Sequence, residues 1–425
     1  MVINPVNKIN GEINVPGDKS ISHRAIMLGS IAKGTTTIKG FLMGEDCLST
    51  IRCFRDMGID IDINDNCVIV KGKGLHGLTK PNKELYVGNS GTTFRLMSGI
   101  LAAQNFDCII TGDDSIKNRP MKRIIDPLRK MGANIESLHN NDKAPIKIIG
   151  SKLNGIKYTS SVASAQIKSC ILLASLYTNN ETQVIEPVLS RNHTEIMLNY
   201  FGGNIVTDNT TAISNPVKEL NANDIIIPGD ISSAAYFMVA CLIIPNSEIL
   251  IKDVGINVTR DGIIRVLKAM GGFIELRNKR EINGELVADI YVKSSSLKGT
   301  VIDKKLIPTL IDEIPVIAVA ACFAEGMTII KDAAELKVKE SNRIETMVTE
   351  LSKLNANIIG TDDGMIIHSS PNLTGATVES YNDHRVAMSL AICGLASKEQ
   401  IYINNSDCVN ISFPNFYKLL DEISK

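Results

Sequence analysis

Polar and charged residues enter apolar stretches at three places in the second half of the chain. A carboxylate precedes "IPVIAVAA", both charge signs mix in "KVKESNR", and "YNDHR" opens "VAMSLAICGLA". A buried charge needs a partner, because removing an unpaired charge from water is costly. Cations and carboxylates gathered at one place could hold anionic substrates and move a proton between them. The residues concerned are Asp312, Lys339, Glu340, Arg343, Asp383, His384 and Arg385.

A second set of polar residues lies in the first half of the chain, and cations and hydrogen-bond donors predominate in it. The segments are "GDKSISHR", "GNSGTT", "NRPM", "SVASAQ" and "RNHTE". Such groups suit the binding of anions, and together with the first set they suggest two anionic substrates. The residues are Lys19, Ser20, Arg24, Asn89, Gly91, Arg119, Ser164, Gln166 and Arg191.

Simpler interpretations exist for some of these motifs. Taken alone, "GNSGTT" is consistent with a helix-capping turn, and "KVKESNR" with a solvated helix start capped by its serine. The "GKGLHG" segment matches a dinucleotide-binding pattern, but Pro81 follows it and no helix does. His193 and Glu195 have no third ligand nearby in the sequence, so we expect no metal site.

The composition excludes several classes of protein. The formal charge of the 425 residues is −1, whereas a nucleic-acid-binding protein would show a basic excess. The nine cysteines are scattered through apolar runs without a Cys-x-x-Cys pair, which favours reduced core thiols in a cytoplasmic protein. The first residues do not resemble a signal peptide, and no apolar run is long enough to span a membrane.

Six segments of similar plan must position these residues. Each begins with small or polar residues, continues as a helix rich in Ala, Leu and Ile, and is followed by a short β-branched strand. A second, amphipathic helix follows, and five of these helices end alike, as in "LRKMGANI" and "LKAMGGFI". The repeat of about 70 residues suits a small α/β unit.

The sixth segment lacks closing strands, whereas the N-terminal "NKINGEINV" resembles a hairpin with an Asn-Gly turn and has no helix of its own. We therefore expect the N-terminal strands to complete the sixth unit, in an α/β protein of two similar domains that are each built from three units. Residues 14–228 would form one domain, and residues 1–13 plus 229–425 the other. The chain would cross between them near Pro16 and Pro228, where "PGDKS" and "PGDIS" repeat. If the helix starts converge on a cleft between the domains, their N–H groups favour anions there.

The motif set, together with "GDISSAAYF" and "LIDEIP", closely resembles the family of 5-enolpyruvylshikimate-3-phosphate (EPSP) synthases, in particular their second class. The resemblance spans nearly the whole chain. It implies an inside-out α/β barrel fold of two domains, each of three βαβαββ units, joined by a double crossover. It also implies transfer of the enolpyruvyl group of phosphoenolpyruvate to the 5-hydroxyl of shikimate 3-phosphate, with release of phosphate, in chorismate and aromatic amino acid biosynthesis. No metal or cofactor is implied, and we expect a monomer.

The resemblance also implies roles for single residues. Asp312 would take the hydroxyl proton, and Glu340, with Lys19, would move the proton at the methylene carbon. Shikimate 3-phosphate would contact Lys19, Ser20, Arg24, Ser164, Gln166, Arg191, Asp312 and Lys339. Phosphoenolpyruvate would contact Lys19, Asn89, Gly91, Arg119, Gln166, Arg343, His384 and Arg385.

Two positions depart from the family pattern. Ala165 stands where many members have a serine, so only its backbone could serve the substrate. Ile411 stands where many members have a lysine, which removes a cation on the phosphoenolpyruvate side and suggests weaker binding of the inhibitor glyphosate.

Two other functions remain open at this point. A UDP-N-acetylglucosamine enolpyruvyl transferase would share the fold, but it typically has Lys-Asn at Lys19-Ser20 and a reactive loop cysteine, whereas Cys108 lies in a strand-like run. A non-catalytic, two-lobed binder of anionic metabolites would explain the cations, but not Asp312 and Glu340.

Overall fold

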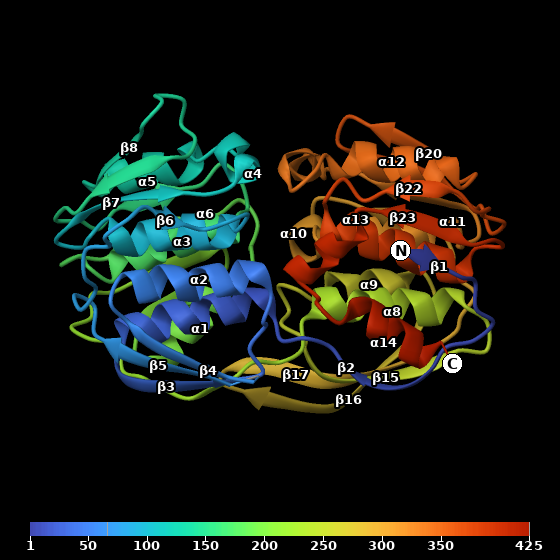
Figure 1. Ribbon diagram of the computed structural model, residues 1–425, viewed down its shortest axis with the longest axis horizontal. Coiled ribbons are helices and arrows are strands. Elements are labelled where there is room, and N and C mark those ends of the chain that lie inside the picture. Colours follow the sequence, from blue (N-terminus) through green and yellow to red (C-terminus); the bar gives the residue numbers. More distant parts are fainter. Residues whose placement is uncertain (66, 425) are drawn as a thin grey trace. The chain divides into compact units, whose positions relative to one another are not determined.

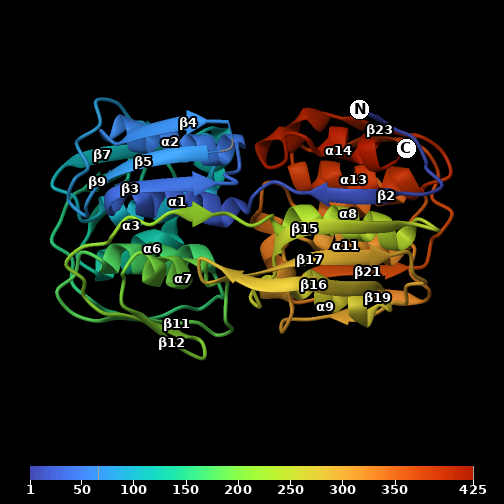
Figure 2. The ribbon, with the colours of Figure 1, turned by 90° about the horizontal axis from the view of Figure 1, so that it is seen from below.

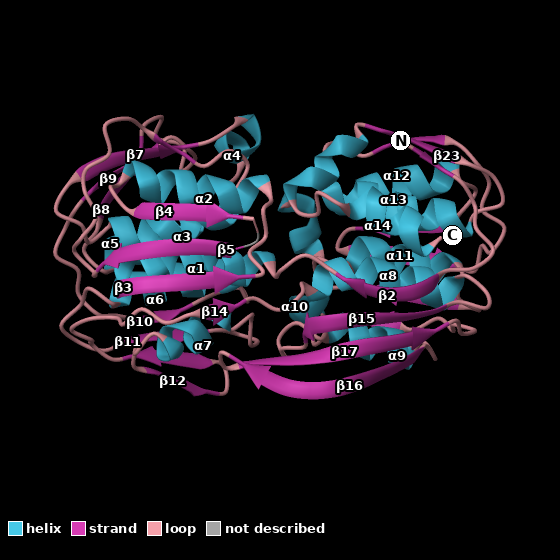
Figure 3. Ribbon diagram, turned by 60° about the horizontal axis from the view of Figure 1, so that its bottom comes forward, coloured by secondary structure: helices cyan, strands magenta, loops and turns pink. Residues whose placement is uncertain are grey.

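The repeated plan of helix and strand appears as six small sheets in the computed structural model, within the described residues 1–65 and 67–424. The chain divides into two units. Unit 1 comprises Met1–Pro16, Pro228–Glu281 and Leu286–Lys425, and unit 2 comprises Gly17–Ile227 and Ile282–Glu285. In Figure 3 the strands of each unit lie around helices.

Unit 2 contains three four-stranded sheets of one topology. In each, an edge strand runs parallel to its neighbour, and the other two strands are antiparallel. The first sheet has the order β14 (Ile225–Ile226), β3 (Lys33–Lys39), β5 (Cys67–Lys73), β4 (Asp60–Asn64). The second is β6 (Leu85–Tyr86), β7 (Asp107–Thr111), β9 (Ile146–Ile149), β8 (Asn134–Ser137). The third is β10 (Lys157–Thr159), β11 (Thr182–Ile185), β13 (Thr211–Ser214), β12 (Ile205–Asp208).

The helices of unit 2 are of two kinds. Those that open each repeat are buried along most of their length, because small and apolar residues occupy nearly every position; they are α1 (Lys19–Ile31), α3 (Gly91–Leu101) and α6 (Ala165–Ser175). Gly99 allows α3 and α6 to approach, since a Cβ there would lie 2.2 Å from the Cys170 carbonyl oxygen. Three other helices expose a polar face; they are α2 (Glu45–Asp56), α4 (Asp114–Asn118) and α5 (Lys122–Lys130). In α7 (His193–Tyr200) the polar residues His193, Thr194 and Glu195 are buried.

Unit 1 repeats this plan, but its last sheet has three strands (Figure 1). The first sheet is β16 (Phe273–Ile282), β17 (Glu285–Lys293), β15 (Glu248–Gly255), β2 (Asn10–Asn14). The second is β18 (Val301–Ile302), β19 (Met327–Ile330), β21 (Gly364–His368), β20 (Asn357–Thr361), and the third is β1 (Val2–Ile3), β23 (Ile401–Asn404), β22 (Thr377–Glu379).

The buried helices of unit 1 are α8 (Ile231–Ile243), α11 (Ile314–Cys322) and α13 (His384–Ala396). Its remaining helices are α9 (Gly262–Ala269), α10 (Ile307–Leu310), α12 (Arg343–Lys353), α14 (Phe416–Ile423) and the 3₁₀ turns η1 (Ala334–Val338) and η2 (Ser406–Ile411). No helix among the described residues is both long and apolar enough to cross a membrane. The nine cysteines are all free thiols.

The N-terminal segment differs from the expected hairpin. Asn10 and Gly11 lie inside β2, which pairs in parallel with β15 (Figure 2). Only β1 joins the sixth sheet, where it pairs with β23. The local Asn-Gly turn signal is wrong here because pairing with β15 gives this backbone an extended partner along its whole length.

The two Pro-Gly-Asp motifs mark where the chain passes between the units, at Pro16–Gly17 and Ile227–Pro228. Each aspartate then caps a helix: Ile21 N–H donates to Asp18 at 2.8 Å, and Ser232 N–H donates to Asp230 at 2.8 Å. The glycines are required by space. A Cβ on Gly17 would lie 1.9 Å from the Gly40 carbonyl oxygen, and one on Gly229 would lie 2.8 Å from Val15.

The strands next to these crossings exchange places. β2 precedes α1 in the sequence but stays in unit 1, beside the strand that follows α8. β14 precedes α8 but stays in unit 2, beside the strand that follows α1. The units change at 16/17 and 227/228, within three residues of the expected boundaries at 14–228, and Ile282–Glu285, the tip of the β16–β17 hairpin, also belongs to unit 2.

Candidate active site

The start of α1 gathers the first group of predicted residues in unit 2. Arg24 is buried and joins three helices. Its guanidinium donates to the Ser20 carbonyl on α1 at 2.9 Å, to the Ser169 hydroxyl on α6 at 2.8 Å and to the Thr194 hydroxyl on α7 at 2.6 Å. Arg191, just before α7, donates to the Ser20 hydroxyl. The helix starts that carry the "GDKS", "SAQ" and "RNHTE" motifs therefore meet around one arginine.

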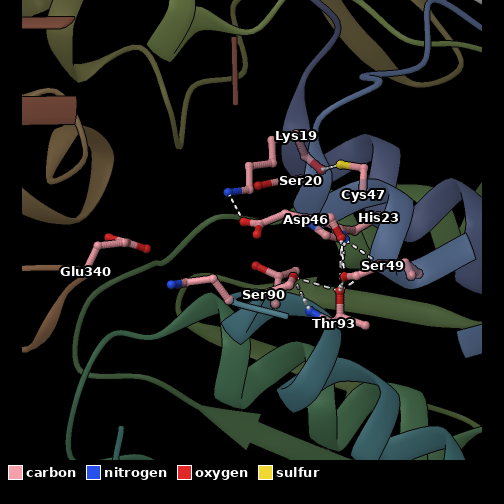
Figure 4. Close-up of polar contacts among 12 residues, drawn as sticks. Lys19, Ser20, His23, Asp46, Cys47, Ser49, Ser90, Thr93 and Glu340 are labelled. Carbon is pink, nitrogen blue, oxygen red and sulfur yellow. Dashed lines mark hydrogen bonds and ion pairs between the residues drawn. The ribbon is translucent and has the colours of Figure 1, made fainter. Parts of the chain in front are cut away.

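Lys19 forms an ion pair with Asp46 at the start of α2 (Figure 4). Both side chains are largely buried, with 17% of Lys19 and 10% of Asp46 exposed. The sequence did not single out Asp46, because "GEDCLST" contains no recognisable motif. Pairing with Asp46 fixes the ammonium at the first residue of α1, where the helix N–H groups also favour anions.

A buried ion-pair network supports the neighbouring loops. Lys168 on α6 lies 2.8 Å from Glu186 and 2.8 Å from Glu195. Glu186 accepts from the N–H groups of Ser164 at 3.1 Å and Ser190 at 3.2 Å. Glu186 therefore holds the backbone at Ser164 and next to Arg191. Sequence reasoning had considered Glu195 only as a weak metal ligand.

A second group in unit 2 surrounds the start of α3. Arg119 donates to the Asn89 carboxamide oxygen at 2.7 Å, and Asn89 donates to Asp113 at 3.0 Å. Ser90 caps α3 by accepting from Thr93 N–H at 3.1 Å, so "GNSGTT" is a capping turn as well as part of this group. Gly91 leaves room for the cation, since a Cβ there would lie 3.1 Å from an Arg119 nitrogen.

Gln166 connects α6 with α3. Its amide donates to the Thr92 hydroxyl at 3.2 Å, and its oxygen accepts from Arg95. Arg95 was not predicted, although it comes only two residues after "GNSGTT". We refer to Lys19, Ser20, Arg24, Asn89, Gly91, Arg119, Ser164, Gln166 and Arg191 as the unit 2 cluster.

His23 lies beneath the unit 2 cluster and was also missed. Its Nδ1 is 2.7 Å from the Thr50 hydroxyl, which contacts Thr93 at 2.7 Å (Figure 4). Burial, aided by the charges of Lys19 and Arg24, lowers the pKa of His23 well below its usual value. The imidazole is therefore neutral at physiological pH, and the cationic character of the cluster comes from its lysine and arginines.

Asp312 is the centre of the second cluster, in unit 1. Its oxygens lie 3.5 Å from Lys339 Nζ, 3.6 Å from Arg343 Nη1 and 3.6 Å from Arg260 Nη1. Burial alone raises the pKa of Asp312, but the surrounding cations outweigh burial and hold the pKa well below its ordinary value. Arg260, which follows "NVT", was not among the predicted residues.

The neighbouring carboxylate faces other partners. Glu313 is buried, accepts from the Ser232 hydroxyl on α8 and lies 3.5 Å from Arg260 Nη2. Arg260 thus lies between two adjacent carboxylates, Asp312 and Glu313, and holds the turn that precedes α11.

Arg343, at the start of α12, is almost completely buried and, besides its ion pair with Asp312, forms hydrogen bonds to two carboxylates. It donates to Asp383 at 2.8 and 3.2 Å and to Glu340 at 2.6 Å. Asp383 caps α13 by accepting from Arg385 N–H at 2.9 Å. His384 is the first residue of α13 and is buried. The serine of "KVKESNR" is not the cap of α12, because Asn342 occupies that position and Ser341 donates to Asp383 instead.

The structure thus sorts the predicted residues into two clusters. Asp312, Lys339, Glu340, Arg343, His384 and Arg385 form the unit 1 cluster, in which carboxylates and cations alternate. The unit 2 cluster consists of cations and neutral residues, and the unpredicted Asp46 pairs with its Lys19. Among the described residues, no group of three His, Cys, Asp or Glu side chains is arranged to hold a metal ion.

Comparison with known proteins agrees with the motifs. Residues 3–420 match the family model of EPSP synthase (3-phosphoshikimate 1-carboxyvinyltransferase). A 3-phosphoshikimate 1-carboxyvinyltransferase from Thermoanaerobacter sp. (strain X514) is 58% identical over 413 residues, covering 97% of each chain. One from Geotalea uraniireducens is 53% identical over 421 residues, covering 99% of this chain and 98% of the other. An EPSP synthase structure from Acinetobacter baumannii superposes with a TM-score of 0.89 at 44% identity, covering 99% and 97% of the two chains.

The chain belongs to the EPSP synthase family. The family, the two-domain α/β fold class and the carboxyvinyltransferase class of enzyme predicted from the sequence are thereby confirmed. A non-catalytic anion binder is no longer needed to explain the cations. The alternative enolpyruvyl transferase is not supported either: Cys108 lies within β7, and burial raises its pKa to about 12, so its thiol is unreactive.

The two departures from the family pattern can now be located. Ala165 is the first residue of α6 and is partly exposed, so its backbone N–H lies in the first turn of that helix. Ile411 is the last residue of η2 and is also partly exposed. Its neighbours Ser412 and Phe413 are buried.

Proposed function

We propose that this chain transfers the enolpyruvyl group of phosphoenolpyruvate to the 5-hydroxyl of shikimate 3-phosphate, with Asp312 as the base. The observation that carries the assignment is the carboxylate of Asp312 held among Lys339, Arg260 and Arg343. A carboxylate in this setting is ionised at neutral pH and can accept a proton. The cations beside it can hold the phosphate and carboxylate groups of the substrates.

The proposed substrate contacts come from both the unit 1 cluster and the unit 2 cluster. We propose that Lys19, Ser20, Arg24, Ser164, Gln166 and Arg191 of unit 2 hold shikimate 3-phosphate together with Asp312 and Lys339 of unit 1. Phosphoenolpyruvate is held by Lys19, Asn89, Gly91, Arg119, Gln166, Arg343, His384 and Arg385. The hydrogen bond from Arg119 to Asn89 and the space left by Gly91 support a site for an anion at the start of α3.

The reaction proceeds by addition and elimination. The 5-hydroxyl oxygen attacks C2 of phosphoenolpyruvate while Asp312 accepts the hydroxyl proton, and a proton is added at C3 by Glu340 with Lys19. In the second step C3 returns a proton, the C2–O bond to phosphate breaks, and enolpyruvyl ether and phosphate leave. Because its pKa is low, Asp312 is a weak base in the ground state. It accepts the proton when attack on C2 makes the hydroxyl acidic.

Substitution of Asp312 tests this assignment. Asp312→Asn keeps the shape of the side chain and removes the base, so we expect phosphate release to fall by about 100-fold or more. Shikimate 3-phosphate should still bind, because the unit 2 cluster is intact. Asp362→Asn, in the exposed turn between β20 and β21, is the matched control and should release phosphate at the wild-type rate. Near-normal turnover of Asp312→Asn would contradict the assignment.

We further propose that the enzyme acts as a monomer in the cytoplasm. The placement of the cysteines in apolar runs supports a reducing compartment. Sedimentation of the purified protein with and without substrates tests the monomeric state, and a stable dimer would contradict it.

A further inference from the structure

The turn before α13 has an unusual backbone. Tyr381 and Asn382 both have φ of 55°, in the left-handed region, and Asp383, His384 and Arg385 follow directly. Asparagine tolerates this conformation, whereas tyrosine seldom adopts it because its Cβ crowds the backbone. A strained backbone of this kind persists only where the surrounding structure holds it, and such sites cluster near functional groups.

Glu350 on α12 holds this turn. It is completely buried and accepts from the Tyr381 hydroxyl at 2.8 Å and from Glu379 N–H at 2.9 Å. Lys353 neutralises it, with Nζ at 2.9 and 2.8 Å from its two oxygens. The hydrogen bond to Glu350 raises the pKa of Tyr381 to about 12, so the phenol remains a donor at neutral pH.

The same helix holds the turn at a second point. Arg343 begins α12 and lies two helical turns before Glu350, and α12 packs against both β22 and α13 (Figure 1). Arg343 binds the Asp383 carboxylate, which caps α13 at Arg385 N–H. The turn from Glu379 to Asp383 is therefore fixed at its start by Glu350 and at its end by Arg343.

We propose that Glu350 and Tyr381 are positioning residues for phosphoenolpyruvate, which act by fixing the turn that sets the direction of His384 and Arg385. This inference rests on the proposed roles of His384 and Arg385. Neither Glu350 nor Tyr381 is proposed to touch a substrate. Their effect is transmitted through the backbone of the turn and the first residues of α13.

Tyr381→Phe is the sharpest test, because it removes one hydroxyl from a side chain that is 44% exposed and leaves the ring in place. Loss of one hydrogen bond to a charged acceptor should raise the KM for phosphoenolpyruvate about 10-fold. The kcat, the affinity for shikimate 3-phosphate and the melting temperature should change little. The matched control is Tyr291→Phe, since the Tyr291 hydroxyl donates to Glu248 at 2.9 Å away from the cluster. The control should leave the KM unchanged.

Glu350→Gln provides a second variant. The amide group can no longer accept from both Tyr381 and Glu379, so we expect a larger rise in the KM for phosphoenolpyruvate. Because Tyr381 and Glu350 share a hydrogen bond, the effects of the two changes on the KM should combine less than additively in the double variant. If each change instead lowers the melting temperature without altering the KM, the role is merely structural and the inference is overturned. Additive effects on the KM would overturn it as well.

Arg385→Gln separates this inference from the proposed function. A raised KM in Arg385→Gln with an unchanged KM in Tyr381→Phe would overturn the positioning role alone. An unchanged KM in Arg385→Gln would overturn the proposed role of Arg385 and the inference that depends on it. A raised KM in both variants, with the Tyr291→Phe control unaffected, is the expected result.

Discussion

Lys19, at the start of α1, is the residue of the unit 2 cluster that we propose to contact both substrates. The ammonium is a compact charge with three donors, which suits contact with a phosphate and a second acid together. Asp46 holds it in the unit 2 cluster. Arg24 of the same helix, which is also proposed to hold shikimate 3-phosphate, joins α1, α6 and α7 through its nitrogens.

We therefore predict that Lys19→Met weakens binding of shikimate 3-phosphate. The change keeps the apolar stem and removes the charge, and each lost charge-assisted hydrogen bond costs about 1.5–3 kcal/mol, or about 10- to 150-fold in affinity. Use of phosphoenolpyruvate should fall further still. Titration calorimetry measures the first effect.

Lys33→Met is the control for this experiment. Lys33 is 71% exposed and its partner Glu219 is 44% exposed, with 3.4 Å between them. Exposed pairs of this kind contribute little, so the control should bind normally. If Lys19→Met also binds shikimate 3-phosphate with wild-type affinity, "PGDKS" serves only as a structural crossing.

Residue types could be predicted from the sequence, but their partners could not. Lys19 and Asp312 stand out because a charge adjoins an apolar helix. Asp46 and Arg260, which pair with them, lie in segments without such contrast. Their importance arises from contacts between residues far apart in the sequence, and no local pattern reports such contacts.

The helices and strands of the repeats were predictable for a physical reason. A buried helix that opens each repeat must be apolar on all sides, and its glycine- or asparagine-terminated partner must be amphipathic. Strand pairing was less predictable. β2 and β14 change places between the sheets, and the Asn10-Gly11 turn signal failed because β15 offers an extended partner.

The tip of the β16–β17 hairpin, which belongs to unit 2, carries Glu285, and this residue contacts the start of α7. Glu285 lies 2.6 Å from His193 Nδ1 at the start of α7, and both side chains are buried. Burial lowers the pKa of His193, but the charge of Glu285 and its hydrogen bond outweigh burial and raise the pKa above its usual value. Asp18 also raises it, and Arg24 opposes the rise.

The contact between His193 and Glu285 predicts that the free energy of unfolding depends on pH. Because the folded-state pKa of His193 is higher than the unfolded one, protonation favours the fold. The stabilisation by protonated His193 is fully present below about pH 6.5, the pKa of histidine in the unfolded chain. It is lost as the pH rises through the pKa of His193 in the folded protein. His193→Gln should be less stable than wild type at pH 6 by roughly 1.5–3 kcal/mol, and the difference should shrink as the pH rises.

Thermal denaturation at a series of pH values measures this difference. His139→Gln is the control, because His139 is exposed in the turn after β8. The control should follow the wild-type curve. A constant difference between His193→Gln and wild type at all pH values would contradict the assignment of the pH dependence to this pair.

At the scale of the whole molecule, the sequence reveals the repeat and the family match covers residues 3–420. The crossings near Pro16 and Pro228 were visible because the same motif occurs twice. The assignment of Ile282–Glu285 to unit 2 could not be predicted from the sequence. A hairpin tip that belongs to the other unit has no sequence pattern of its own. The proposed reaction uses residues from both clusters, so in this proposal each unit supplies only part of the chemistry.

We predict that shikimate 3-phosphate draws the two units together. Its phosphate and hydroxyl groups are proposed to contact residues of both clusters, and closure around an anionic ligand excludes water from the reacting groups. Small-angle scattering should therefore show a smaller radius of gyration with shikimate 3-phosphate than without it. Shikimate, which lacks the phosphate, is the control ligand and should have a weaker effect at equal concentration. Lys19→Met should reduce the change, because the phosphate loses a cation of the unit 2 cluster. A radius of gyration that stays constant while calorimetry shows saturation would contradict closure and leave the clusters acting without a domain movement.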